Sequence, residues 1–164
     1  ASKSSKLECL HGLAKVILEE SGIQSGDVLM VASTSGVNAV PVEMATEATE
    51  LGACVIGITS IGASKATPLR NGSGKRLFEL ADIVIDTHVP YGDAGIQVEG
   101  VAQRIAPLST AIGVAIVNAL VVRTVKILVE RGLEPPIFTS ANIPGGQEFN
   151  GALLKRYKHQ IRAF

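Results

Sequence analysis

The sequence predicts an α/β domain, a three-layer sandwich with a parallel sheet between layers of helices. Two observations carry this prediction. Three short apolar runs, at 27–32, 54–58 and 82–85, have the continuous hydrophobicity of strands that are buried on both faces. They alternate with longer segments of helical spacing, and strands connected in this way form parallel sheets through right-handed crossovers.

The chain is long enough for one such domain. Its 164 residues fall within the usual size range of a domain, and 46% of them are hydrophobic, so the folded chain can bury a substantial core. The sequence contains no repeat and no linker-like segment that would divide it. We therefore expect residues 1–164 to form a single domain.

The first half of the chain is expected to alternate twice between helix and strand. Apolar residues recur at helical spacing over 7–20, and the Ser-Gly pair that follows ends this helix. The strand over 27–32 leads through a loop at 33–36 into a helix over 38–51, whose first turn can hold a proline. A glycine ends this second helix, and the strand over 54–58 follows.

The second half of the chain contains one more strand and the longest helix. In order, we expect a loop over 61–74, a short helix over 75–81, a strand over 82–85, an irregular segment over 89–107, a helix over 109–131 and a final helix over 147–162. Three strands make a thin sheet for this architecture, so a fourth strand is expected to complete it.

Composition argues against several classes of partner and cofactor. The 15 basic and 15 acidic side chains balance, and the only aromatic residues are four Phe and two Tyr, which argues against nucleic-acid binding. Two cysteines, Cys9 and Cys54, make neither a disulfide framework nor a zinc site. The chain also lacks a nucleotide-binding P-loop and a dinucleotide fingerprint. We expect no metal, no cofactor and a cytoplasmic location.

The longest helix carries the most apolar part of the chain. Its apolar run, 111–122, is 12 residues long and contains Asn118. A helix needs about 20 apolar residues to cross a bilayer, so no membrane partner is expected. Because the helix over 109–131 is apolar nearly all round its first half, we expect it to form the interface of a homo-oligomer.

Two neighbouring strand ends carry loops rich in small hydroxyl residues. Ligands of open α/β sheets bind at the carboxyl ends of the strands, and the first of these loops runs directly into a helix N-terminus. Backbone N–H groups and hydroxyls in such a place favour an anion, above all phosphate. The alternative is that the hydroxyls only cap helices. The candidate phosphate-binding residues are Ser33, Thr34, Ser35, Gly36, Thr59 and Ser60.

The end of the third strand carries two candidate acid–base groups, Asp86 and His88. A carboxylate and an imidazole close to a bound sugar could transfer protons. The alternative interpretation is that His88 only forms hydrogen bonds within its own loop.

The first hydroxyl loop and its surroundings resemble a known family. A strand, then Ser33-Thr34-Ser35-Gly36, Asn38, a helix, a strand and Thr59-Ser60 is similar to the sugar isomerase (SIS) domain, which binds phosphosugars. From about residue 5 to residue 161, the chain resembles an uncharacterised bacterial SIS group related to phosphoheptose isomerases. The stretches that carry this resemblance are Ser5-Lys6-Leu7-Glu8, Ser35-Gly36-Val37-Asn38-Ala39-Val40-Pro41, Val89-Pro90-Tyr91-Gly92-Asp93-Ala94 and Glu134-Pro135-Pro136.

The resemblance implies a flavodoxin-like sandwich that assembles through its helices. It implies that residues 33–35 hold the phosphate and that residues 59–60 line the same pocket. It also implies that proton-transfer residues come from the region before and within the last long helix, where Glu99 and Gln103 are the matching candidates.

The chain departs from this family at its beginning. Such proteins normally start with a long helix and a strand that ends in a Gly-Ser-Gly-His-Ser-like loop, and the sequence contains no such segment. We therefore expect an SIS-type domain that lacks its first helix and strand.

Two functions follow for this chain. The first is binding of a phosphorylated sugar with aldose–ketose isomerisation through an enediol, which needs a carboxylate or histidine base and no metal. The alternative is a non-catalytic phosphosugar sensor, in which binding regulates assembly or a partner. A purely structural domain is the third hypothesis, because one fold serves many functions.

Overall fold

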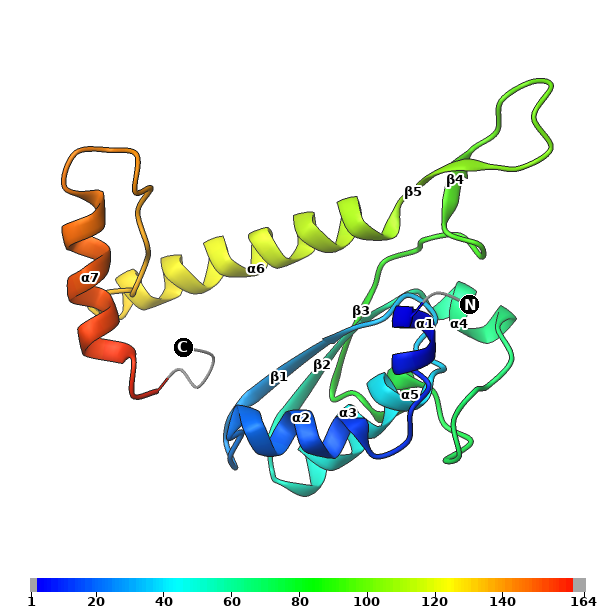
Figure 1. Cartoon of the computed structure of the whole chain (residues 1–164), viewed down its shortest axis with the longest axis horizontal. Helices are drawn as coiled ribbons and strands as arrows, with labels where there is room; N and C mark the ends of the chain where they lie inside the picture. The colour runs from blue at the N-terminus through cyan, green and yellow to red at the C-terminus, as the bar shows by residue number, and fades with distance from the viewer. Residues whose placement is uncertain (1–2, 161–164) are drawn as a thin grey trace. The chain divides into compact units, whose positions relative to one another are not determined.

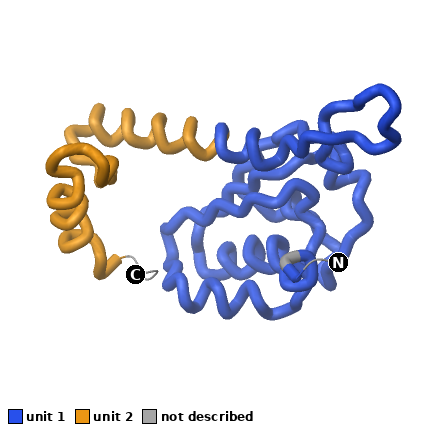
Figure 2. The backbone as a smooth tube through the Cα atoms, turned by 45° about the horizontal axis from the view of Figure 1, so that its top comes forward, with its two compact units in different colours: residues 1–115 blue, residues 116–164 orange. Residues whose placement is uncertain are grey.

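The computed structural model describes residues 3–160 of the chain (Figure 1). Its helices and strands fall into two compact units, residues 1–115 and residues 116–164 (Figure 2). The elements are, in order, α1 (Lys3–Leu7), α2 (Leu13–Ser21), β1 (Val28–Ala32), α3 (Ala39–Glu50), β2 (Cys54–Thr59), α4 (Ile61–Ala66), α5 (Leu77–Leu80), β3 (Ile83–Asp86), β4 (Ala94–Ile96), β5 (Ile105–Pro107), α6 (Ser109–Glu130) and α7 (Gly146–Tyr157).

The first unit is built on a parallel sheet with the strand order β1-β2-β3. Val28 of β1 pairs with Cys54 of β2, and Thr59 at the end of β2 pairs with Asp86 at the end of β3. The predicted α/β class with a parallel sheet is confirmed, and all three predicted strands are present. Their carboxyl ends lie side by side, which brings the loops after them to one edge.

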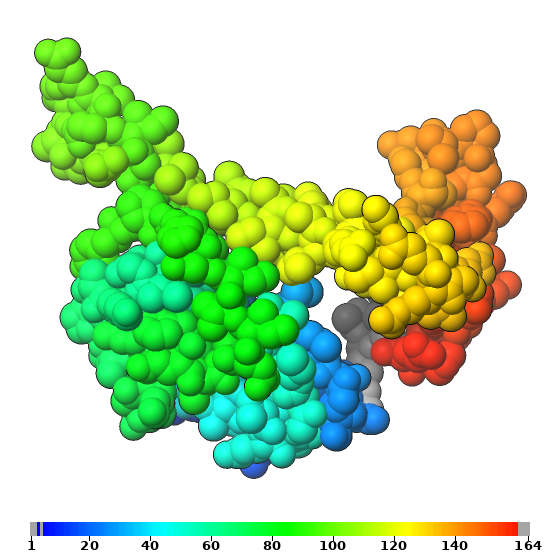
Figure 3. All heavy atoms as spheres, turned by 180° about the vertical axis from the view of Figure 1, so that it is seen from behind, coloured from blue at the N-terminus to red at the C-terminus, as the bar shows by residue number. Residues whose placement is uncertain are grey.

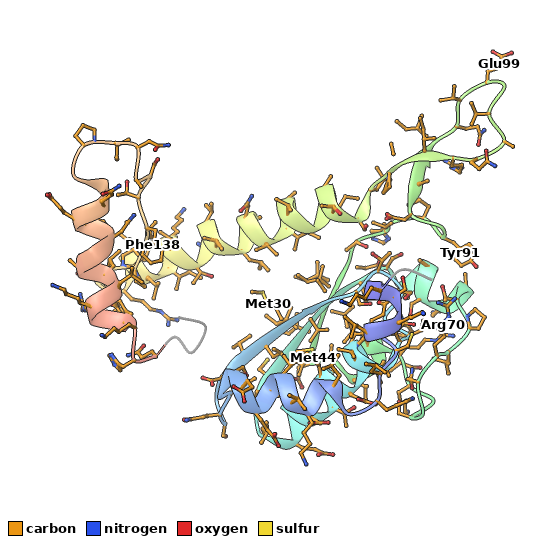
Figure 4. All side chains as sticks on the ribbon, in the orientation of Figure 1. Met30, Met44, Arg70, Tyr91, Glu99 and Phe138 are labelled. Carbon is orange, nitrogen blue, oxygen red and sulfur yellow. The ribbon has the colours of Figure 1, made fainter. Side chains whose placement is uncertain are left out.

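Helices α2, α3 and α5 cover one face of this sheet and form the core with it. Successive residues of a strand point to opposite faces. Val31 of β1 is therefore buried in this core, with Met44 of α3 packed against it, whereas Met30 points to the other face and is 48% exposed (Figure 4). The buried residues of the core cluster are Leu18, Val31, Ala45, Ala48, Ala53, Val55 and Leu77.

Three segments differ from the sequence-based expectation. The helix expected over 7–20 begins only at Leu13, because Gly12 adopts a left-handed conformation with φ of 82°. The loop expected over 61–74 starts with the short helix α4, whose N-terminal Ala63 N–H donates to the Ser60 hydroxyl. The segment expected to be irregular over 89–107 contains the antiparallel hairpin β4–β5.

Helix α6 has 22 residues and matches the helix predicted over 109–131. Its most apolar window has a mean hydropathy of 2.0 with none of the window buried, so by length and composition it could cross a membrane. The apolar part of α6 is therefore longer than the 12-residue run at 111–122 that the sequence analysis considered. A single helix of this kind is weak evidence for a membrane segment, although the core helices of soluble proteins that have the same composition are mostly buried and this one is not.

The second unit contains the later turns of α6 and the helix α7. Asn150 of α7 holds the preceding loop, since its amide accepts from the backbone N–H of Thr139 at 2.9 Å and donates to the carbonyl of Thr139 at 2.8 Å. Phe138, in the same loop, lines an apolar groove beside Leu153 and Tyr157 of α7 (Figure 4). The predicted final helix is present, and its residues 161–162 lie outside the described part of the chain.

Candidate functional site

The two predicted hydroxyl loops are joined by hydrogen bonds. The carbonyl of Thr34 accepts from the backbone N–H of Ser60 at 3.0 Å and from the hydroxyl of Thr59 at 3.1 Å. The backbone N–H of Ser33 donates to the carbonyl of Ile58 at 3.0 Å. The structure therefore brings together the strand ends that the sequence singled out.

A tight turn shapes the first loop. The backbone N–H of Gly36 donates to the Ser33 hydroxyl at 3.2 Å, and its carbonyl accepts from the N–H of Leu77 at 2.9 Å. Gly36 has a φ of 56°, and a Cβ atom there would lie 2.8 Å from the Cβ of Leu77 and 3.2 Å from the hydroxyl oxygen of Thr59. Only glycine satisfies both the conformation and the space.

Several donors of this loop are free. Among residues 3–160, no hydrogen bond is made by the backbone N–H groups of Thr34, Ser35 and Val37. The hydroxyls of Thr34 and Ser35 likewise make no hydrogen bond within these residues, and both residues are half-buried, whereas Val37 is fully buried and its N–H is closed to a ligand. Successive free N–H groups in a loop form an anion-binding concavity. The loop can therefore donate several hydrogen bonds to one phosphate group.

The N-terminus of α3 contributes less than expected to this site. Asn38 precedes the helix, its side chain makes no capping bond, and its buried Oδ1 has no partner in the described part of the chain. The backbone N–H of Val40 donates to the carbonyl of Glu8 at 3.0 Å, and Pro41 has no N–H to offer. Because the first turn is closed in this way, the free donors for an anion lie in the loop, at residues 34 and 35, rather than on the helix.

Thr59 and Ser60 support the loop instead of facing its open side. Both are buried, and the hydroxyl of Thr59 is used by Thr34. The hydroxyl of Ser60 donates to the carbonyl of Val89 at 2.7 Å and accepts from the N–H of Ala63 at 3.2 Å. Their role in binding stays a prediction, and their structural role is that of positioning residues.

A pocket of about 290 Å³ opens beside the loop, within the first unit. Ser33 and Thr34 line it, together with three hydroxyl residues that the sequence analysis did not assign to the site, namely Thr87, Ser109 and Thr110. The remaining lining residues are Ala32, Ile58, Gly113 and Val114. The polar groups of this otherwise apolar pocket are therefore hydroxyls, and no charged side chain among the described residues lines it.

The sequence offers different signals for the three additional residues. Thr87 directly follows the third strand, so the rule that placed the other loops at strand ends could have identified it. Ser109 and Thr110 were expected only as helix caps, and their place at the pocket depends on where α6 begins. Asp93 fixes the start of α6, because its carboxylate accepts from the N–H groups of Leu108 and Ser109 at 3.0 and 2.8 Å.

The pKa of Asp93 is lowered, so it is ionised at neutral pH. The hydroxyl of Ser109 donates to its carboxylate and lowers the pKa, partial burial raises it, and the N–H groups of Ser109 and Leu108 lower it further. A carboxylate at this position satisfies N-terminal donors of α6 and complements the positive end of its dipole.

Asp86 and His88 form a pair at the end of β3. The carboxylate of Asp86 accepts from the backbone N–H groups of His88 and Ile61 at 3.0 and 3.2 Å, and its second oxygen lies 3.4 Å from Nδ1 of His88. His88 has a left-handed φ of 52°, and its side chain is 85% exposed. Partial burial raises the pKa of Asp86, but the two N–H groups and His88 together lower it by more.

The other two acid–base candidates lie on the β4–β5 hairpin. Glu99 and Gln103 belong to the connection between its strands, and both are exposed. Neither lines the pocket beside the first loop, and Figure 4 shows Glu99 at the free end of the hairpin. The structure brings Asp86 and His88 together but does not bring Glu99 or Gln103 to them within this chain.

Comparison with known proteins identifies relatives along the whole chain. Residues 1–60 match the family model of the SIS domain. The chain is 43% identical over 158 residues to a UPF0309 protein of Shouchella clausii, an alignment that covers 96% of this chain and 64% of the relative. It is 44% identical over 161 residues to a UPF0309 protein of Halalkalibacterium halodurans, covering 98% of this chain and 64% of that relative.

A third relative gives the same result. A UPF0309 protein of Streptomyces griseus is 42% identical over 161 residues, which are 98% of this chain and 64% of the relative. The chain thus spans a little less than two thirds of the length of these relatives. The expected resemblance is confirmed: residues 1–60 match the SIS domain model, and the chain is similar to UPF0309 proteins over nearly its whole length.

Proposed function

We propose that this chain binds a phosphorylated sugar at the loop formed by residues 33–37. The observation that carries the proposal is the pair of free, half-buried backbone N–H groups at Thr34 and Ser35, next to serine and threonine hydroxyls. The match to the SIS domain covers this loop and supports a sugar-related ligand.

Phosphate and sugar would occupy different parts of the site. The N–H groups and hydroxyls of the loop suit the phosphate oxygens, because charged acceptors make the stronger hydrogen bonds. The adjacent pocket, with hydroxyls from Thr87, Ser109 and Thr110, suits the hydroxyl groups of the sugar. Since no lysine or arginine lines the pocket, hydrogen-bond geometry would select the ligand rather than net charge.

Calorimetry with fructose 6-phosphate and fructose tests this proposal. We expect the phosphorylated sugar to bind and the free sugar to bind at least a hundredfold more weakly, since phosphate contacts supply most of the affinity. Equal heats for the two ligands, or no binding of either, would contradict a phosphosugar site.

Isomerisation is the second candidate function, and it would use the Asp86–His88 pair, which flanks Thr87 of the pocket without lining the pocket itself. Asp86 would orient the imidazole through Nδ1, so that Nε2 could take the proton from the carbon next to the carbonyl. The proton would return to the neighbouring carbon while another moves between the two oxygens of the enediol. The roles of Glu99 and Gln103 remain predictions. Without such a base, the chain would act as a phosphosugar sensor.

Deuterium exchange into the sugar phosphate separates these two functions. If the pair is catalytic, the hydrogen next to the carbonyl exchanges with D₂O, and His88→Ala and Asp86→Ala each slow this exchange by roughly 100-fold or more. His159→Ala, which alters a histidine after α7, should leave the rate unchanged. Undiminished exchange in both site variants would remove the acid–base assignment, and binding without exchange would support the sensor.

Assembly through α6 belongs to the same proposal. Within residues 3–160 no residue of this helix is buried, and Val114, Val117, Val121 and Val122 are all exposed. A second copy that packs against this surface would cover it. A cytoplasmic location and the absence of nucleic-acid and membrane partners stay predictions.

A charge on α6 should disrupt this assembly. We expect Val117→Asp or Val121→Asp to dissociate or precipitate the protein, because the carboxylate would be buried without a partner in the interface. Light scattering of the unmodified chain gives the reference state. A stable monomer of 17.1 kDa at high micromolar concentration would contradict an α6 interface.

A further inference from the structure

We propose that the β4–β5 hairpin is an interaction arm, which docks against the same arm of a second copy of this chain. The arm comprises residues 94–107, namely β4, β5 and their connection over 97–104. In Figure 3 its atoms, coloured light green, extend beyond the rest of the first unit. The inference rests on three properties of the arm: its internal order, its exposed apolar side chains and its pattern of charges.

Polar contacts within the arm keep it ordered. Ala94 pairs with Pro107, and Ile96 pairs with Ile105. The side-chain amide of Gln97 donates to the carbonyls of Val98 and Val101 at 3.3 and 2.5 Å, which closes the connection.

The arm is also held by contacts across its strands and at its base. The guanidinium of Arg104 donates to the carbonyl of Gly95 at 2.7 Å, across the two strands. Asp93, directly before β4, accepts from the first N–H groups at the start of α6, as described above. The arm is therefore a preformed element, and a partner would bind it at a low entropic cost.

The apolar side chains of the arm are left uncovered. Ile96, Val98, Val101 and Ile105 are between 40% and 53% exposed. Ile96 and Ile105 are directly paired across the strands, so they lie on the same face. A hairpin with two strands is at best marginally stable alone in water, and clustered apolar exposure marks an interaction surface. Burial of this face against a partner would stabilise the arm.

The charges on the arm fit a second arm. Glu99 lies at the tip and Arg104 lies next to β5, and neither forms an ion pair within residues 3–160 (Figure 4). When two arms pack antiparallel about a twofold axis, the tip of each lies beside the connection end of the strands of the other, where Arg104 is placed. Glu99 of each copy then faces Arg104 of its partner, and this contact occurs twice. This complementarity selects a second copy as the occupant.

Charge reversal on the arm tests this pairing directly. Ala102→Cys, in a chain whose Cys9 and Cys54 are replaced by alanine, places a pyrene label on the arm, so that excimer emission reports contact between two arms. We expect Glu99→Arg and Arg104→Glu each to weaken excimer formation at least tenfold, because like charges then face each other at both contacts.

Two combinations should restore the contact. One is the double variant Glu99→Arg/Arg104→Glu, and the other is an equal mixture of the two single variants. In both, a positive side chain again faces a negative one at each contact. Glu20→Arg on α2, which makes the same change in net charge away from the arm, should leave excimer formation as in the parent chain.

Several outcomes would overturn the inference. The first is a parent chain whose excimer emission does not depend on concentration. The second is excimer emission in the single variants equal to that of the parent. The third is excimer emission in the double variant as weak as in the single variants. Near-ultraviolet circular dichroism of each variant checks that the exposed substitutions leave the fold intact. A contact through α6 would not produce this pattern, since neither Glu99 nor Arg104 lies on that helix.

Discussion

Replacing Gly36 with alanine is expected to lower the free energy of unfolding by about 3 kcal/mol and to abolish sugar phosphate binding. The new Cβ would meet the Cβ of Leu77 at 2.8 Å and the hydroxyl oxygen of Thr59 at 3.2 Å, on a backbone with φ of 56°. The loop cannot relax without breaking the bond from the N–H of Leu77 to the carbonyl of Gly36. Chemical denaturation measures the loss.

Gly74→Ala is a matched control for this substitution. Gly74 also has a positive φ, of 71°, but a Cβ there would meet no atom within 4 Å. Its replacement should cost only about 1 kcal/mol, the strain of the left-handed conformation, and leave binding unchanged. If the two variants lose the same stability, the close contact of Gly36 with Leu77 is not what requires glycine there.

The double substitution Ser33→Ala/Ser35→Ala is expected to have the second largest effect. It should weaken sugar phosphate binding by about 2 kcal/mol, or roughly 30-fold, from the loss of hydrogen bonds to a charged group. Ser33 also accepts from the N–H of Gly36, so part of the loss reflects a less ordered turn. Calorimetry gives the affinity, and denaturation shows how much stability is lost with it.

Ser73→Ala provides the comparison for these hydroxyl substitutions. Ser73 lies in an exposed turn, where its hydroxyl contacts only Asn71 and the N–H of Lys75. We expect its removal to leave sugar phosphate affinity unaltered. An unchanged affinity in the double variant would instead show that residues 33 and 35 do not hold the phosphate.

The parallel sheet and its loops could be predicted from sequence because each depends on local pattern. The runs at 27–32, 54–58 and 82–85 are continuous and apolar, and each proved to contain a strand. The β4–β5 hairpin was missed because its strands have only three residues each, within a segment rich in Gly and Pro. Helix α4 was missed because it is a single short stretch, stabilised by one capping residue, Ser60.

The candidate site was predictable only in part, because some of its residues are placed by local pattern and others by contacts that form only on folding. Ser33 and Thr34 follow a strand directly, so the strand-end rule placed them in the pocket that they line. The buried hydrogen bonds of Thr59 and Ser60 depend on the register between β2 and its neighbours, which no local pattern specifies. The contribution of Ser109 depends on Asp93, which lies 16 residues earlier in the chain and meets it only after folding.

Amide NMR can show whether the free N–H groups of Thr34 and Ser35 bind phosphate. A titration of the labelled chain with fructose 6-phosphate should shift the amide signals of Thr34 and Ser35 most strongly and saturably, because these half-buried donors have no partner within residues 3–160. Inorganic phosphate should shift the same two signals more weakly, and fructose should not shift them. Saturable shifts elsewhere, with these two amides unchanged, would contradict a phosphate site at this loop.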